Sequence, residues 1–447
     1  MATQTSNLLS RLESEYQNNK LSDTERAKLL EELKVLGRNP AQAAPIFIEK
    51  NFQLLCKYAF DTGICTASRE AMRCLANAML LNEGSRQTFI DLGYPGKAAD
   101  RLQNDNRDDE FLASRIIFFA TYTGKLDIAS LINKHDLAGS IIKNLERAVS
   151  RLDSQSPDSN PITPMAFQET LKLIPNIVYY SPESTTSLQP ALNPLATLLQ
   201  KSPLPAPALQ PPTTLMINAL LNINPPASKV EDASLREPLY PLSDPSSLTT
   251  RLVRILTTDF PSKLTPQSEP QFAPILSLLR TLHSSAPPEV QASLKSQLLP
   301  SDASRDKVIG TDTSLPSRLL RATTDPSATT LRDTVSALLF EVSSSSSSEL
   351  VHNIGYGYAV GVLTRLGVEF DASSLQQDDE EGAEVNPITG QRRDMEAPVE
   401  VDDMTEEEKE REAERLFVLF ERLKATGVVD VKNPVEMARE QGLFDKD

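Results

Sequence analysis

The residues with the clearest spacing for chemistry are three glycines near the three-quarter point of the sequence. The stretch "HNIGYGYAVGVLTRLG" places Gly355, Gly357 and Gly361 almost as in the G-x-G-x-x-G turn that holds the phosphates of a dinucleotide. That turn follows a strand, whereas "SSSSSSELVHNI" precedes Gly355 here, and the last glycine stands one place late. We therefore expect a junction of helices in which Gly357 and Gly361 have neighbours too close for a Cβ.

Other candidates for chemistry are weaker. "TGKLD" at 123–127 contains Gly-Lys but lacks the first Gly and the Ser/Thr of a phosphate-binding P-loop. The histidines His135, His283 and His352 have no ligand partners at i+3 or i+4, so no zinc site is predicted. Neither G-x-S-x-G nor H-E-x-x-H occurs. The sequence predicts no enzyme, no cofactor and no metal; a phosphate-loop enzyme is a third hypothesis, which direct nucleotide binding would revive.

The composition favours helices packed on helices. Trp is absent, aromatic residues make up 5% and hydrophobic residues 39% of the chain, with many Leu and Ala. The net charge of -16 argues against a nucleic-acid or anionic-membrane surface, because such surfaces need a basic stripe. Residues 371–447 hold 23 acidic against 10 basic residues, so most of the acidity belongs to a tail. A protein partner is the expectation.

The three cysteines and the N-terminus indicate a reducing compartment. Cys56, Cys65 and Cys74 are odd in number, have no CxxC spacing, and lie in segments that are expected to be buried helix. The N-terminus lacks the apolar core of a signal peptide, and no run approaches 18 apolar residues. We expect a cytoplasmic monomer without a membrane span, with recruitment to the cell cortex by its partner as a further expectation.

Similar apolar stretches recur along the chain. Three of them have an asparagine at the centre, and a fourth, "SRIIFFATYTG" (114–124), has the same length and apolar character without it. Asn77 and Phe118 are 41 residues apart, and Asn176 and Asn218 are 42 apart, close to the period of about 40 to 47 residues in armadillo and HEAT repeats. The three stretches are "AMRCLANAMLLN" (71–82), "TLKLIPNIVYYS" (170–181) and "TTLMINALLNIN" (213–224). The pattern predicts an all-α, armadillo/HEAT-like α-solenoid over residues 1–370.

The recurrent asparagines have two interpretations. An Asn in an apolar helix lowers helix propensity and needs a hydrogen bond if it is buried. Each could tie its own helix to a neighbour, or the set could line a concave groove and bind the backbone of a partner. The recurrence at repeat spacing favours the groove. Lys34 and Arg38, four residues apart on one side of a helix, could attract an acidic partner there, although a solvated helix face is the commoner explanation for such a pair.

The tail has its own pattern. "MTEEEKEREAERLFVLFERLKATG" predicts an amphipathic helix over 405–426, because Thr405 and Glu408 have capping-box spacing and an apolar stripe includes Leu416, Phe417 and Phe420. That stripe could cover the solenoid or contact a partner. The acidic segment 371–403 is too polar to fold alone and is predicted to be a tether, which leaves 404–447 as a C-terminal segment.

Several of these segments together resemble the synembryns, also called the resistance-to-inhibitors-of-cholinesterase proteins. The strongest matches are "GYGYAVGVLTRLG" (355–367), "NPITGQ" (386–391) and "MTEEEKEREAERLFVLFERL" (404–423), in that order. "LKVLGR", "RCLANAMLLN" and "SRIIFFATYTGKLDI" resemble the N-terminal repeats of that family. The similarity spans nearly the whole chain.

The resemblance implies a cytosolic chaperone and nucleotide-exchange factor for heterotrimeric G-protein α subunits. In that family the solenoid groove holds the C-terminal helix of the α subunit, and the tail extends toward its GTPase domain. Lys34, Arg38, Asn77 and Phe118 match groove positions, while Asn176 and Asn222 fall in corresponding helices. A solenoid adaptor or scaffold that binds an extended or helical peptide is the alternative function.

Overall fold

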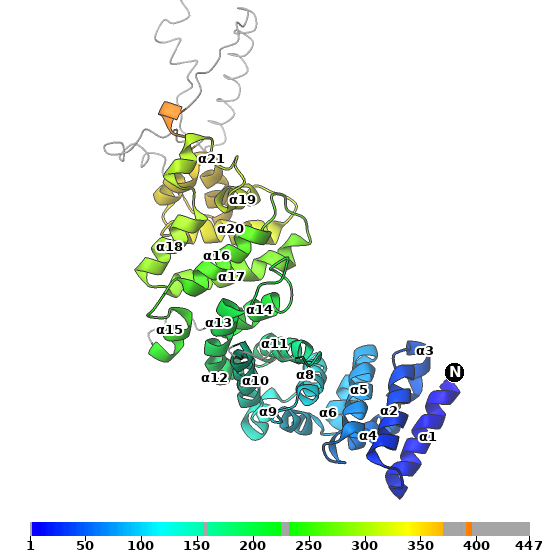
Figure 1. Ribbon diagram of the computed structural model, residues 1–447. Coiled ribbons are helices and arrows are strands. Elements are labelled where there is room, and N and C mark those ends of the chain that lie inside the picture. The colour runs from blue at the N-terminus through cyan, green and yellow to red at the C-terminus, as the bar shows by residue number, and fades with distance from the viewer. Residues whose placement is uncertain are drawn as a thin grey trace, which may run out of the picture. The chain divides into compact units, whose positions relative to one another are not determined.

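The computed structural model describes residues 2–152, 154, 159–224, 232–369, 386 and 390–395, and these ranges contain helices and no extended strand. The all-α prediction is confirmed. Figure 1 shows the helices in chain order. The first eleven are α1 (Ala2–Asn18), α2 (Asp23–Leu36), α3 (Pro40–Ala43), α4 (Glu49–Phe60), α5 (Thr66–Leu81), α6 (Glu83–Asp91), α7 (Pro95–Arg101), α8 (Arg107–Thr121), α9 (Ile128–His135), α10 (Leu137–Leu152) and α11 (Thr163–Tyr180).

The helices that follow are shorter on average because prolines recur between and within them. They are α12 (Thr185–Leu188), α13 (Leu192–Lys201), α14 (Thr213–Ile223), α15 (Ala233–Leu239), α16 (Ser247–Asp259), α17 (Ser268–Ser285), α18 (Pro288–Leu298), α19 (Leu315–Ala322), α20 (Thr329–Val342) and α21 (Ser347–Leu366). Short 3-10 turns join several of them, including Asp302–Asp306 and Arg393–Met395.

The helix contacts divide the chain into two compact units. The first comprises Met1–Leu299 and Asp312–Ser344. The second comprises Pro300–Thr311 and the chain from Ser345 onward. The solenoid boundary expected after residue 370 stays a prediction, and the expected helix over 405–426 lies outside the described residues, as does most of the acidic segment 371–403.

One row of helices runs through the first unit, and we call it the ladder. It consists of α2, α5, α8, α11, α14, α17 and α20, each of which packs on the next. Apolar residues spaced for a buried helix face hold the row together, as with Leu112, Ile116 and Phe119 on α8. Burial of each such side chain contributes about 1.5–3 kcal/mol. The asparagine-bearing stretches of the sequence all fall on ladder helices.

Hydrogen bonds show that ladder helices run parallel. Asp23, at the start of α2, accepts from the amides of Thr66 and Ala67 at the start of α5, at 3.1 and 3.0 Å. These amides have no partner within their own helix, so the neighbouring carboxylate satisfies them and also complements the helix dipole. Glu269 accepts from the amide of Thr330 in the same way between α17 and α20, at 3.0 Å. The carboxyl ends of the ladder helices therefore lie along one edge.

A second row, formed by α10, α13, α16 and α18, packs behind the ladder. Arginines from neighbouring helices cap the carboxyl ends of α13 and α16 in this row. Arg251 of α16 donates to the carbonyl of Ser202, which ends α13, and Arg318 of α19 donates to the carbonyl of Thr257 in the last turn of α16 at 2.8 Å. A guanidinium suits this position because it supplies several donors to carbonyls that lack a helical partner.

The glycines of "GYGYAVG" lie on α21 in the second unit, and only the first interrupts the helix. Gly355 is buried with φ 74° and ψ 152°, which breaks α21 into two segments. Gly357 and Gly361 are exposed, and a Cβ added at Gly361 would meet no atom within 4 Å. The prediction of close neighbours is wrong for Gly361, and Gly357 is open to solvent; the break in the helix lies at Gly355 instead.

The cysteine prediction is correct for two of the three positions. Cys56 and Cys74 are free and buried, and burial raises the pKa of both thiols. Cys65 is half-buried and begins α5, where its Sγ accepts from the amide of Ser68 at 3.4 Å. It lies at a helix start rather than inside one, so it is exposed to solvent on one side.

The two glycine environments predict opposite effects of alanine. Gly355→Ala should lower the free energy of unfolding by about 1–3 kcal/mol, because its φ and ψ are strained for any residue with a Cβ. Gly361→Ala should raise it by about 0.5–1 kcal/mol, since alanine loses less backbone entropy in an open helical position. Urea-induced unfolding of both variants checks the sign; equal destabilisation would contradict the location of the break.

Candidate functional site

The predicted groove residues of the solenoid lie on consecutive ladder helices. Each of the ladder helices α2, α5, α8, α11 and α14 carries at least one predicted groove residue. Their side chains range from half-buried to exposed, so none belongs to the core. The predicted tail residues Leu416, Phe417 and Phe420 lie outside the described residues. The ladder positions are Lys34 and Arg38 at the end of α2, Asn77 on α5, Phe118 on α8, Asn176 on α11 and Asn222 on α14.

The two predicted cations differ in what they contact. Lys34 forms an ion pair with Glu70 of α5 at 2.8 Å, with both side chains less than 15% exposed, and lies 3.5 Å from Glu31. Its charge is therefore already used to join α2 to α5. Arg38 is exposed and forms no ion pair or side-chain hydrogen bond with the described residues. Of the pair, Arg38 has the charge that a partner could meet.

The asparagines differ in the same way. Asn176 donates to the hydroxyl of Thr121 on α8 at 2.9 Å, and Asn222 donates to the carbonyl of Asn218 in its own helix at 2.8 Å. The amide of Asn176 ties its helix to a neighbour, as the simpler interpretation expects, whereas that of Asn222 bonds within its own helix. Asn77 is half-buried, and its side chain makes no hydrogen bond among the described residues.

Asn218 is the residue on α14 that the choice of site residues missed. Its side chain is half-buried and, within the described part of the chain, makes no hydrogen bond, whereas Asn222 one turn later is tied back to it. The signal was available, because Asn218 is the centre of the recurrent stretch and stands 42 residues after Asn176. A half-buried amide without a partner has both donors and its acceptor open to a bound backbone.

Phe118 takes part in an aromatic and cationic cluster at the carboxyl end of α8. Its ring packs edge-on against Tyr122 with centroids 5.1 Å apart, and the ammonium of Lys172 lies 6.0 Å from its centroid. Arg86 lies 5.7 Å from the ring of Tyr122, which is half exposed. Aromatic rings held in this way offer a rigid apolar surface with cations at its border.

Exposed apolar side chains follow the carboxyl ends of four ladder helices. Single exposed apolar residues are ordinary on a protein surface, but parallel packing places these ends next to one another. Tyr179 is 76% exposed and packs edge-on against Tyr180. We call this set the apolar rim: Val35 of α2, Leu80 and Leu81 of α5, Tyr122 after α8, and Tyr179 and Tyr180 of α11.

The opposite, amino-terminal end of the ladder is charged and internally paired. Asp109 of α8 is fully buried and accepts from Arg69 of α5 at 2.9 Å and from Arg101 of α7 at 3.1 Å. Glu110 accepts from Thr170 of α11 at 3.1 Å and pairs with Arg107; burial raises its pKa, and the arginine opposes that change. These charged side chains pair with one another within the fold, so little unpaired charge remains there to attract a ligand.

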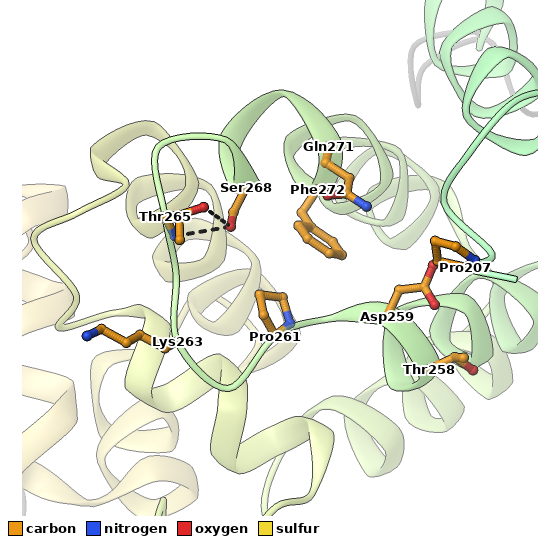
Figure 2. Close-up of a pocket in the computed structure, with 9 residues that line it drawn as sticks. All are labelled: Pro207, Thr258, Asp259, Pro261, Lys263, Thr265, Ser268, Gln271 and Phe272. Carbon is orange, nitrogen blue, oxygen red and sulfur yellow. Dashed lines mark hydrogen bonds between the residues drawn. The ribbon is translucent and has the colours of Figure 1, made fainter.

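A separate hollow of about 400 Å³ lies between the end of α16 and the start of α17 (Figure 2). Four of its polar lining residues, Thr258, Asp259, Thr265 and Ser268, bond to the protein itself. Thr265 and Ser268 hydrogen-bond each other at 3.1 and 3.2 Å, as Figure 2 shows, and Asp259 accepts from the amide of Leu209 at 2.5 Å. We interpret it as a packing gap between loops.

Searches of the described residues for other kinds of site give two findings. No group of three or more His, Cys, Asp or Glu side chains there is arranged to hold a metal ion. None of the described helices has the length and apolar character needed to cross a membrane.

The two kinds of asparagine predict different stabilities. Asn176→Ala should lower the free energy of unfolding by about 0.5–1.5 kcal/mol, because it removes the bond to the buried Thr121. Asn77→Ala should leave it unchanged or raise it by a few tenths, about 0.5 kcal/mol at most, since alanine is the better helix former. Chemical denaturation of both variants measures this, and a loss at Asn77 equal to that at Asn176 would show that Asn77 is structural.

Known proteins resemble this chain over different lengths. The Chaperone Ric-8A of Pongo abelii is 24% identical in an alignment of 450 residues that covers 92% of this chain and 83% of that protein. A synembryn-like chaperone of Schizosaccharomyces pombe is 29% identical over 187 residues, which is 38% of this chain and 35% of that protein. The crystal structure of an engineered protein covers 63% of this chain at 16% identity with a TM-score of 0.44, too low to support an argument.

The chain also matches a model that describes a whole protein family. That model is described as "Guanine nucleotide exchange factor synembryn", and it matches residues 29–443. The match takes in the ladder, α21, "NPITGQ" and the predicted tail helix. The chain therefore belongs to the synembryn family of guanine nucleotide exchange factors.

Proposed function

We propose that this protein promotes nucleotide release from heterotrimeric G-protein α subunits and shelters them during folding, by binding their C-terminal helix along the ladder. The observation that carries the proposal concerns Asn77 and Arg38. Their side chains make no hydrogen bond or ion pair among the described residues, and they lie beside the apolar rim on the same helices. A helix laid into a groove presents apolar residues at i, i+3, i+4 and i+7, and its polar ends need partners. The apolar rim would contact the apolar residues of the bound helix, and Asn77 and Arg38 would bind its polar groups.

The dimensions of the ladder suit a helix of moderate length. Neighbouring packed helices lie about 8–10 Å apart, so α2, α5, α8 and α11 together extend over about 30 Å. An α-helix rises 1.5 Å per residue, and a helix of about 20 residues would cover that distance. Arg38, at the α2 end, is placed to receive a terminal carboxylate, with which a guanidinium forms two parallel hydrogen bonds.

Such a factor makes and breaks no covalent bond. It can shift an α subunit toward its nucleotide-free form only by binding that form more tightly than the nucleotide-bound form. Capture of the C-terminal helix would withdraw it from the GTPase core and loosen the guanine site. The same capture would cover an apolar helix that an unfinished α subunit leaves exposed, which accounts for the chaperone role.

Groove binding is tested with a synthetic peptide that carries the C-terminal sequence of an α subunit. Arg38→Ala with Asn77→Ala should weaken its binding by about 2–3 kcal/mol, or roughly 30- to 150-fold, because one charged and one neutral hydrogen-bonding group are lost. Titration calorimetry gives the two affinities.

The matched control is Arg254→Ala with Asn193→Ala, an exposed arginine and asparagine on second-row helices. This variant should bind the peptide as the wild type does. Equal affinity of all three proteins would refute the groove. Peptide binding without any nucleotide release from an intact α subunit would instead favour the adaptor function.

A second test separates the tail from the groove. Truncation after Leu375 should leave peptide affinity unchanged, because every described groove residue remains, but should slow GDP release from the intact α subunit. The measurement is release of a fluorescent GDP analogue with and without residues 376–447. Equal release rates would remove the tail from the mechanism.

A further inference from the structure

One buried arginine in the second unit joins "NPITGQ" to the turn of α21 that precedes "GYGYAVG". Arg305 is 5% exposed and donates to the carbonyls of His352 at 2.7 Å and Asn353 at 3.3 Å, both on α21. It also donates to the carbonyl of Gly390 at 3.1 Å, in "NPITGQ". One guanidinium thus joins Asn353 and Gly390, which are 37 residues apart in sequence, and is itself 85 residues from Gly390.

The need for this arginine follows from the break in α21. The positive φ of Gly355 interrupts the helix, so carbonyls in the turn before it lose their usual amide partners. Arg305 satisfies two of them. Its nearest carboxylate, that of Asp302, is fully exposed and 3.8 Å away, so neutral carbonyls rather than an ion pair compensate most of its burial. The carbonyl of Gly390 is the third acceptor.

Further contacts hold the segment Gly390–Met395, which we call the strap. The amide of Arg392 donates to the carbonyl of Arg305 at 2.8 Å, and the side chain of Gln391 donates to the carbonyl of Asp306 at 3.1 Å. A Cβ at Gly390, where φ is +66°, would lie 2.6 Å from Cδ1 of Ile309. The strap therefore lies directly against the Asp302–Asp306 turn and the residues that follow it.

The strap shortens the chain that connects the body to the predicted tail helix. Counted from Gly367, which ends α21, Thr405 is 38 residues further on, a length of chain that can span ~130 Å at most. Counted from Met395, the end of the strap, it is ten residues further on, which can span ~35 Å at most.

We infer that Arg305 and the strap are positioning elements that fix the chain to the second unit at Met395, so that a shorter tether leads to the C-terminal segment when an α subunit is bound. The inference rests on the proposed function. Effective concentration falls roughly as the −3/2 power of tether length, so release of the strap should lower it about sevenfold. Binding of the C-terminal peptide in the groove should not change.

The test uses the full-length chain and two glycine variants. Gly390→Val introduces a side chain against Ile309 and should release the strap, whereas Gly367→Val has the same φ of +66° but no atom within 4 Å of its Cβ. Hydrogen exchange of a peptide covering 386–395 reports the strap directly, through the bonded amide of Arg392. Arg305→Ala is a second route to the same release.

The expected result is loss of amide protection in Gly390→Val and Arg305→Ala, with GDP release at limiting concentrations slowed about sevenfold and peptide affinity kept. Gly367→Val should retain both protection and release. Lost protection with an unchanged release rate would overturn the positioning role and leave the proposed function intact. Amide protection retained in both strap variants would show that Arg305 and Gly390 do not hold the strap. Absence of GDP release by the wild type would overturn the proposed function.

Discussion

The ladder depends on a fully buried carboxylate. Asp109 joins Arg69 of α5, Arg101 of α7 and, at 3.3 Å, the amide of Asn104 in the turn before α8. A buried ion that loses its partners is strongly destabilising, so this carboxylate favours the register that brings the three elements together. That register sets which helix ends lie side by side, and the apolar rim exists because the carboxyl ends coincide.

Charge and apolar surface are separated along the ladder for a related reason. The amino-terminal ends hold acids and bases that satisfy one another, as Arg107 and Glu110 do, and this pairing continues to mid-helix, where Arg115 and Lys172 donate to Glu169 at 3.1 and 2.9 Å. The carboxyl ends are left with rings, aliphatic side chains and a few uncommitted polar groups. A binding surface of this kind selects its ligand by shape and by a small number of hydrogen bonds, because the nearby charges are already neutralised.

The sequence predicted the helices and the ladder positions, since apolar spacing and repeat period are local signals. It could not separate Asn77 from Asn176, because the partner of Asn176 is Thr121, on another helix. It also predicted the special backbone position at Gly357 and Gly361 rather than at Gly355. The sequence around a glycine does not show whether that glycine has a positive φ. Arg305 gave no signal at all, since every acceptor it binds is a backbone carbonyl at least 47 residues away.

The arginines that cap the carboxyl ends of α13 and α16 affect how the sequence of this fold can vary. Arg251 and Arg318 bind main-chain oxygens, which every residue possesses, so the joint between two repeats requires one particular side chain on one partner and none on the other. The capped helices can therefore exchange their surface residues, and the loops between them can grow or shrink, without loss of the joint. At these two joints mutational freedom is therefore one-sided: the helix that contributes the arginine must keep it, whereas the helix that receives it needs no particular side chain.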